Sequence, residues 1–358
     1  MNLIFFQNCI SPHQIPYIRE CTKDERIGSV HLIVPRTDYD ERRDMGWDST
    51  HLLEGTLIRL WLSPTNEQVI QLFKETKDAV CFFTGIRAFS DVFCWFRLSL
   101  AYQVRRYIIT EPPLVYNKPL WMHYLRFFIQ DYRYISRIDG IFGFGDLAVR
   151  YYRNISKRWD VFPFQYVTET SKRTLPPPSG KVKLLFVGSL IPRKNVQIVM
   201  EALKDNLEID FTLVGDGPER SKLEKLAQKN RVNARFLGTK PMSEVPEFMQ
   251  HNDVLILPSL HDGWGAVVNE AMTLGLYVIV SDRCGAKALI ADETDGLIFK
   301  SKDVSSLKEA LGHIVSHIQN IRLMTDKRVE RTVRIQGKQV ANYFVNCISR
   351  AKGDEKYL

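Results

Sequence analysis

The sequence predicts an α/β protein of two domains, each built on a doubly wound parallel sheet, and three observations lead to this prediction. The chain has 358 residues, which is more than one hydrophobic core usually organises. Strand and helix patterns alternate at short intervals, and several strands are continuously apolar, as expected where helices cover both faces of a sheet. Three consecutive prolines at 176–178 can continue neither a helix nor a central strand. We therefore expect two domains facing each other across a cleft, with ligands beyond the carboxyl ends of the strands.

The C-terminal half shows the alternation most clearly. Its expected strands span residues 182–187, 210–214, 234–237, 253–257 and 277–281. Its expected helices span residues 195–203, 219–228, 245–249 and 266–273. In the N-terminal half, the expected strands span residues 2–7, 30–34, 57–61, 79–83, 107–109 and 140–144. We expect an N-terminal domain over 1–175, a C-terminal domain over 176–320, and a helix and tail over 321–358.

The last of these segments carries apolar residues at roughly helical intervals between Leu323 and Ala351. Basic residues lie between the apolar positions. This pattern predicts one long amphipathic helix with a basic exposed face.

Composition excludes several classes of protein. With 45% apolar and 25% charged residues, the chain is typical of a globular protein. The apolar stretch at 1–6 is short and lacks a basic start, so it indicates a first strand rather than a signal peptide, and no run approaches the ~20 apolar residues of a membrane span. Six scattered cysteines are expected in the core of a cytoplasmic protein, without disulfides or a zinc site. They are Cys9, Cys21, Cys81, Cys94, Cys284 and Cys347.

The net charge of +8 is unevenly distributed. Between Arg87 and Arg158 there are 12 Lys or Arg residues against 5 Asp or Glu residues, mixed with Trp and Tyr. Such a mixture suits an anionic lipid headgroup layer, although a solvated face over an aromatic core is an equally good interpretation. No motif for nucleic-acid recognition accompanies it, so we expect no nucleic-acid partner. A non-enzymatic binder of anionic membranes or nucleic acid stays open as an alternative function.

The strongest chemical signal spans residues 258–272, where an apolar strand ends and a helix begins. Gly263 and Gly265 would let a ligand approach the backbone, and the free N–H groups of a helix start favour an anion. Asp262 opens the loop, and Glu270 follows eight positions later, about two turns into the expected helix. Carboxylates accept hydrogen bonds from hydroxyls. The pattern therefore suits a polyhydroxylated ligand that carries a phosphate.

A second signal follows the first strand of the C-terminal half. Gly188 begins a loop that ends in Arg193 and Lys194, at the sheet edge where ligands bind. A guanidinium fork beside an ammonium group can hold a diphosphate. The turn at 215–218 is interpreted as a tight turn without chemistry.

Together these motifs resemble glycosyltransferase family 4, which has the GT-B fold. The family carries Gly-x-x-x-x-Arg-Lys, Gly-x-Gly-Pro and Pro-Ser-x-x-Glu-Gly-Phe-Gly-x-x-x-x-Glu-Ala-Met, which appear here at 188–194, 215–218 and 258–272. The resemblance covers about residues 182–300. Asp262 stands where the family has Glu, and Trp264 replaces the usual Phe, which puts the identity of the donor sugar in question. The resemblance implies two Rossmann-like domains, with the C-terminal helix returning to the N-terminal domain.

Residue by residue, the resemblance assigns Arg193 and Lys194 to the diphosphate of a nucleotide-sugar donor, and Glu270 to the ribose hydroxyls. Asp262 and the loop at 263–266 would hold the transferred sugar, the loop through its backbone amides. The other implied donor-binding residues of the loops are Gly188, Gly238, Thr239, Gly263, Trp264, Gly265 and Ala266. The implied chemistry is transfer with retention, through front-face attack, with no metal, no cofactor and no protein nucleophile.

The N-terminal domain is expected to bind the acceptor. His13 follows the first strand and is a candidate for phosphate contact or proton transfer, and Glu111 follows another strand and could orient an acceptor hydroxyl. We expect a retaining glycosyltransferase that uses a UDP-sugar and a lipid-linked or glycan acceptor in surface polysaccharide or lipopolysaccharide synthesis. It would act in the cytoplasm, peripherally at the inner face of the plasma membrane. The enzymatic alternatives are a GT-B sugar-nucleotide epimerase and a glycogen-type phosphorylase or synthase.

Overall fold

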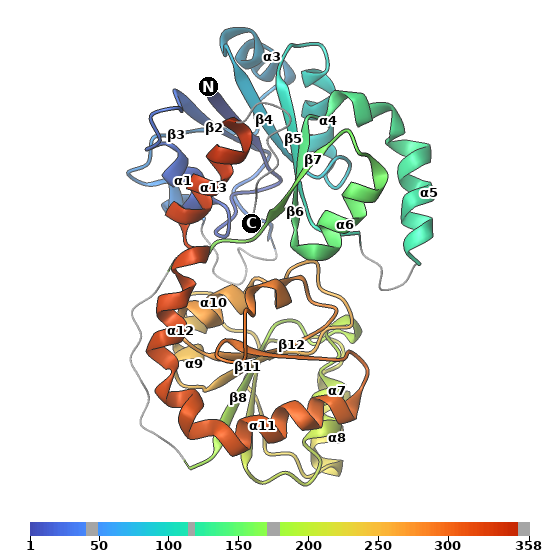
Figure 1. Cartoon of the computed structure of the whole chain (residues 1–358), viewed down its shortest axis with the longest axis vertical. Coiled ribbons are helices and arrows are strands. Elements are labelled where there is room, and N and C mark those ends of the chain that lie inside the picture. Colours follow the sequence, from blue (N-terminus) through green and yellow to red (C-terminus); the bar gives the residue numbers. More distant parts are fainter. Residues whose placement is uncertain (41–48, 114–118, 170–179, 350–358) are drawn as a thin grey trace.

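The computed structural model describes residues 1–40, 49–113, 119–169 and 180–349 of the chain. They form two parallel sheets with helices on their faces, one above the other along the long axis of the molecule (Figure 1). The α/β prediction is therefore confirmed. The triple proline and the expected boundary near residue 175 lie outside the described residues.

The upper sheet has the strand order β3-β2-β1-β4-β5-β6-β7. Its strands are β1 Asn2–Phe6, β2 Ser29–Val34, β3 Ile58–Leu62, β4 Ala79–Thr84, β5 Arg105–Thr110, β6 Gly140–Phe144 and β7 Asp160–Phe164. Its helices are α1 Ile15–Cys21, η1 Thr50–Leu53, α3 Asn66–Glu75, α4 Ser90–Ser99, α5 Leu120–Gln130, η2 Tyr132–Arg137 and α6 Gly145–Ile155. All strands are parallel, but the order in which they are added to the sheet reverses between β1 and β4. A doubly wound sheet binds ligands at such a switch point.

The lower sheet has the strand order β10-β9-β8-β11-β12-β13 and reverses between β8 and β11. Its strands are β8 Val182–Val187, β9 Ile209–Val214, β10 Ala234–Phe236, β11 Val254–Leu257, β12 Tyr277–Ser281 and β13 Gly296–Phe299. The short helices around it are η3 Pro192–Lys194, α7 Gln197–Ala202, α8 Arg220–Lys229, α9 Val245–Gln250, α10 Val267–Thr273 and η4 Gly285–Leu289. The chain ends in α11 Val304–Leu323, α12 Thr325–Arg331, η5 Thr332–Ile335 and α13 Gly337–Ser349.

Every strand expected from the sequence is present, to within two residues at either end. Two further strands, β7 and β13, were missed. β7 contains Pro163, which argues against a central strand but is tolerated here because β7 lies at the edge of its sheet. β13 is only four residues long.

The cores follow from the alternation of side chains along the strands. In β1, Leu3 and Phe5 belong to a core that continues into the lower domain, whereas Ile4 and Phe6 belong to a second core on the opposite face of the upper sheet. The prediction of core cysteines holds for five residues, which are buried, but Cys94 is exposed. In the part of the chain that the structure describes, no helix is both long and apolar enough to cross a membrane.

The single long helix expected at 323–351 is wrong. The segment is broken into α12, η5 and α13, because it crosses from the lower domain to the upper one and must change direction (Figure 1). α13 then packs against α1, with Phe344 stacked on Phe5 and Phe82. The return of the C-terminal helix to the N-terminal domain is thereby confirmed.

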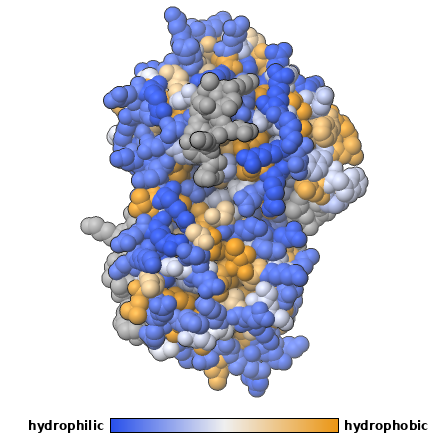
Figure 2. Space-filling view, in the orientation of Figure 1, coloured by the Kyte–Doolittle hydropathy of each residue, from blue (hydrophilic) through white to orange (hydrophobic). Residues whose placement is uncertain are grey.

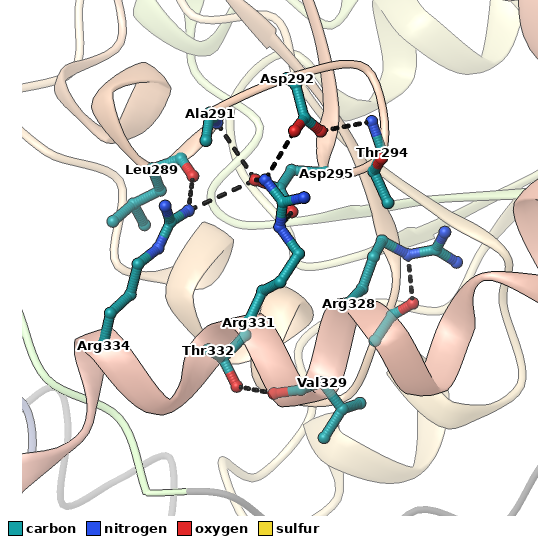
Figure 3. A network of polar contacts seen from close by, with 11 residues as sticks. Leu289, Ala291, Asp292, Thr294, Asp295, Arg328, Val329, Arg331, Thr332 and Arg334 are labelled. Atoms are coloured by element: carbon teal, nitrogen blue, oxygen red, sulfur yellow. Dashed lines mark hydrogen bonds and ion pairs between the residues drawn. The ribbon is translucent and has the colours of Figure 1, made fainter.

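The expected basic exposed face of this segment is wrong for Arg328, whereas Arg331 is partly exposed and Arg334 is exposed. Arg328 is 2% exposed and donates to the carbonyl oxygens of Gly275 and Ile321. Arg331 and Arg334 contact the carboxylate of Asp295, which is fully buried in the turn before β13 (Figure 3). Their charges therefore anchor the crossing segment to the lower domain.

We predict that Asp295→Ala destabilises the protein by about 3 kcal/mol, because it leaves two arginines facing a buried site without their carboxylate. Urea unfolding followed by circular dichroism measures the change. Glu309→Ala, at an exposed position of α11, is the matched control and should change stability by less than about 0.5 kcal/mol. Equal effects of the two substitutions would contradict an anchoring role for Asp295.

Candidate active site

The loop between β11 and α10 forms one of the contacts that join the two domains. Its Trp264 is 1% exposed, and the ring lies against Phe144 and Tyr166 of the upper domain. The indole N–H donates to Asn269 Oδ1 at 2.6 Å, and Asn269 Nδ2 donates to the Tyr166 carbonyl oxygen at 2.8 Å. At a neighbouring contact, a Cβ atom on Gly145 would lie 3.2 Å from the carbonyl oxygen of Gly285. The carboxyl ends of both sheets are therefore held close together.

The two cations of the loop after β8 converge on Asp262. Lys194 Nζ lies 2.5 Å from Asp262 Oδ2, and Arg193 Nη1 lies 3.7 Å from the same oxygen. Arg193 also donates to the carbonyl oxygen of His261 at 2.8 Å. Asp262 is 9% exposed, so these charges meet in a largely desolvated place. One carboxylate facing two cations leaves a positive charge, which favours an anionic ligand.

The turn at 215–218 has a structural role that the sequence did not reveal. Gly215 lies so close to the carbonyl oxygen of Gly188 that it has no room for a side chain, and its φ of 133° suits glycine. Leu190 N donates to the Asp216 carbonyl oxygen at 2.9 Å. The turn therefore supports the loop that carries Arg193 and Lys194.

Glu270 meets the other domain through His13. The distance from His13 Nε2 to Glu270 Oε1 is 3.5 Å. Glu270 lies in the first turn of α10, not two turns into the helix as expected, because α10 begins only at Val267. Burial raises the pKa of Glu270 from its ordinary 4.5 to about 7.

Glu111 reaches across from the end of β5 into the same crevice. It accepts a hydrogen bond of 2.8 Å from the Tyr166 hydroxyl, and its carboxylate lies against Gly263, where a Cβ atom would collide with it. Desolvation by the surrounding protein raises the pKa of Glu111 above its ordinary value. The hydrogen bond from Tyr166 and the positive charges of Arg193 and Lys194 lower this pKa, whereas the negative charge of Asp262 raises it. These influences place Glu111 within electrostatic reach of the cationic loop.

A cavity of about 590 Å³ opens beside Glu111 on the upper-domain side of the crevice. It lies beyond the carboxyl ends of β4, β5 and β6, and its wall mixes aromatic, cationic and acidic side chains. Its wall includes Glu111, His123, Arg126, Phe127 and Tyr166. A cavity of this size with a few convergent polar groups suits a small substrate.

The remaining predicted residues fall into two groups. Gly263, Gly265 and Ala266 belong to the loop at the crevice, and Gly188 belongs to the cationic loop beside it. Gly238 and Thr239 lie after β10, with the Gly238 carbonyl oxygen accepting from Gly215 N at 2.8 Å. They therefore follow the edge strand β10 and lie beside the turn that supports the cationic loop.

Sequence reasoning missed three residues that shape the site. Tyr166 was hidden because it follows the unassigned strand β7, and Asn269 looked like any polar residue of a helix. His261 is 2% exposed, and burial lowers its pKa while nearby Asp262 opposes that effect. Among the described residues, no three or more His, Cys, Asp or Glu side chains are grouped so that they could hold a metal ion.

The fold and the site define a class of protein: two parallel α/β sheets facing each other, with a C-terminal helix that returns to the first domain, make a GT-B protein. Residues 167–325 match the family model "Glycosyl transferases group 1". The match covers less than half of the chain, and over this segment the chain resembles that group.

Curated relatives match over about half of the chain. An uncharacterized glycosyltransferase of Methanocaldococcus jannaschii is 30% identical over 45% of this chain and 43% of its own length. The UDP-Gal:alpha-D-GlcNAc-diphosphoundecaprenol alpha-1,3-galactosyltransferase of Escherichia coli is 31% identical over 48% of this chain and 43% of its own length. The alignments thus span less than half the length of each relative.

Solved structures match along nearly the whole chain. The Anabaena protein HepE in complex with UDP superposes with a TM-score of 0.72 at 12% identity, covering 98% of this chain and 100% of its own. The lipopolysaccharide outer core galactosyltransferase WaaB superposes with a TM-score of 0.71 at 15% identity, covering 98% and 99% of the two chains. At these identities the likeness establishes the fold.

The raised pKa of Glu270 predicts a pH-dependent stability. A carboxyl group that holds its proton more tightly in the folded state lets the unfolded state ionise first, so the free energy of unfolding falls as pH rises from about 4.5 to about 7. We expect Glu270→Gln to remove about 1 to 3 kcal/mol of this fall between pH 5 and pH 8. Urea midpoints at both pH values measure it, with Glu309→Gln as the exposed control. Identical pH dependence in wild type and Glu270→Gln would contradict the shift.

Proposed function

We propose that the protein is a retaining glycosyltransferase that moves a sugar from a nucleotide-sugar donor, most simply a UDP-sugar, to an acceptor bound by the upper domain. The observation that carries the proposal is the meeting of Arg193, Lys194 and Asp262 of the lower domain with Glu111 of the upper domain at the mouth of a cavity. The cations would bind the phosphate groups of a substrate, and the carboxylates would bind the hydroxyl groups of a sugar at its other end.

On the donor side, Arg193 and Lys194 bind the diphosphate and stabilise the charge that develops as the nucleotide leaves. Glu270 accepts hydrogen bonds from the ribose hydroxyls. Asp262 and the backbone amides of residues 264–266 hold the transferred sugar. Lys194 and Asp262 form an ion pair of 2.5 Å. The diphosphate bound by Lys194 and the sugar bound by Asp262 would therefore lie next to each other.

The same arrangement supports transfer without a protein nucleophile. The bond between the anomeric carbon and the diphosphate oxygen breaks, and a bond to the acceptor oxygen forms on the same face of the sugar. The acceptor proton passes to the departing phosphate oxygen. The protein contributes positioning and charge stabilisation, with Gly238 and Thr239 at the edge that would hold the base.

On the acceptor side, Glu111 orients the attacking hydroxyl, and His13 contacts the donor end of the crevice through Glu270. The acceptor is a lipid-linked or glycan molecule of surface polysaccharide or lipopolysaccharide synthesis, met at the cytoplasmic face of the membrane. Two relatives support this choice. The Escherichia coli enzyme is named for a diphosphoundecaprenol-linked acceptor, and WaaB for the lipopolysaccharide outer core.

The donor assignment predicts that Lys194→Ala weakens UDP binding about tenfold to a hundredfold, the loss of one charge-assisted contact. Isothermal titration with UDP measures the affinity. Lys308→Ala, at an exposed position of α11, should bind UDP like the wild type. Undiminished affinity in Lys194→Ala would remove the diphosphate role of this loop.

The acceptor assignment predicts that Glu111→Gln lowers the rate of transfer about tenfold to a hundredfold while UDP affinity stays within about twofold. The wild-type rate should rise with pH as the Glu111 carboxyl group ionises, above its ordinary range, because its pKa is raised. Transfer of labelled sugar to a lipid-linked glycan, measured against pH, tests both points. An equal loss of transfer and of UDP binding would place Glu111 on the donor side instead.

Release of free sugar without an acceptor would favour an epimerase.

A further inference from the structure

The outer side of α5 exposes an unusual concentration of large apolar side chains. Trp121 is 63% exposed, Leu125 is 53% exposed and Ile129 is 74% exposed. The same side carries Met122, Phe128 and Tyr132. These positions recur at helical intervals, so they form one stripe along the helix. We call these six residues the α5 face. Figure 2 shows the corresponding apolar surface at the right-hand edge of the upper domain.

The inner side of the same helix is already packed. Tyr124 stacks on Tyr151 of α6 with ring centroids 4.8 Å apart, and Phe127 lies against Trp159 at 5.8 Å. The Tyr151 hydroxyl donates to the His123 carbonyl oxygen at 3.1 Å. The α5 face is therefore not needed to hold the helix in place. A helix that is apolar on both sides, at the edge of the fold, calls for something that covers its outer side.

The charges around the α5 face indicate what covers it. Residues 119–160 contain seven Lys or Arg residues and four Asp or Glu residues. The seven basic residues, all exposed, are Arg126, Arg133, Arg137, Arg150, Arg153, Lys157 and Arg158. Of the acids, Asp131 pairs with Arg87, and Asp139 accepts from the backbone N–H of Arg106. Exposed basic residues on α5 and on its neighbours η2 and α6, together with exposed Trp, Tyr and aliphatic side chains, complement an anionic lipid surface.

The α5 helix also borders the cavity beside Glu111. His123, Arg126 and Phe127 line that cavity, while Trp121, Leu125 and Ile129 point away to solvent. One helix therefore separates the cavity from the apolar outer surface. A lipid-linked acceptor held at a bilayer would have a short path from that surface to Glu111.

We propose that the α5 face inserts into the interfacial layer of an anionic lipid bilayer and that the surrounding arginines contact its headgroups. The membrane binding stands on the surface itself. The further statement that it presents a lipid-linked acceptor to the cavity rests on the proposed glycosyl transfer.

Vesicle co-sedimentation of the full-length protein tests the proposal. Vesicles of phosphatidylcholine mixed with phosphatidylglycerol should bind the wild type at least about tenfold more tightly than vesicles of phosphatidylcholine alone, and salt should weaken the binding. The variant Trp121→Gln, Leu125→Gln, Ile129→Gln should lose about tenfold or more of the partition coefficient. The matched control is Leu207→Gln with Leu323→Gln, since these two leucines of the lower domain are 73% and 82% exposed and lie outside the α5 face.

Each outcome decides the proposal. Loss of binding in the α5 variant but not in the control supports it. Equal binding by all three proteins would overturn it, as would equal binding to the two kinds of vesicle. Sedimentation equilibrium tests the alternative that the α5 face is an interface between copies of this chain. A wild-type dimer and a monomeric α5 variant would support that alternative and overturn the membrane proposal.

Titration with UDP keeps the two proposals apart. The α5 variant should bind UDP like the wild type, which also shows that it is folded. If the wild type binds anionic vesicles but not UDP, the donor assignment fails and the membrane surface stands. If it binds UDP but not vesicles, the surface fails and the donor assignment stands.

Discussion

The burial of one indole ring fixes how the two domains meet. A buried indole N–H needs an acceptor, and Trp264 finds it in Asn269, which in turn donates to the backbone of Tyr166 in the other domain. The rings of Phe144 and Tyr166 close around Trp264. Since the hydrogen bonds are directional, the loop at 262–266 can take only a narrow range of positions against the upper sheet. The contacts of Glu111 with Gly263 and of His13 with Glu270 depend on that position.

The charges of the crevice follow from the same closeness. Arg193 and Lys194 share the single carboxylate of Asp262 in a place that water reaches poorly. In such surroundings electrostatic interactions are stronger than in bulk water, so a second anion is attracted to the uncompensated charge. The opposite happens at Glu270, where burial favours the protonated carboxyl group. The two ends of the crevice therefore differ in the ligand groups they favour.

Several elements were readable from local sequence because their physical cause is local. Continuous apolar runs such as 182–187 predict buried strands, and glycines flanking Trp264 predict a tight loop before a helix. The edge strand β7 was not predicted because it contains Pro163, and proline generally argues against a strand. Proline is tolerated here because β7 lies at the edge of the sheet. The basic exposed face expected for the crossing segment was wrong in part for a related reason. Its arginines look exposed until a buried acid such as Asp295 is found opposite them.

The sequence by itself determined the two α/β halves, the family resemblance of residues 182–300, and the residues Arg193, Lys194, Asp262 and Glu270, because each depends on spacing along one segment. Tertiary structure alone decided that Lys194 and Asp262 are partners, that Glu111 and Tyr166 reach them from another domain, and that the outer side of α5 is left uncovered. These relations join residues dozens of positions apart. They arise from the packing of whole sheets and helices, which no local pattern of residues encodes.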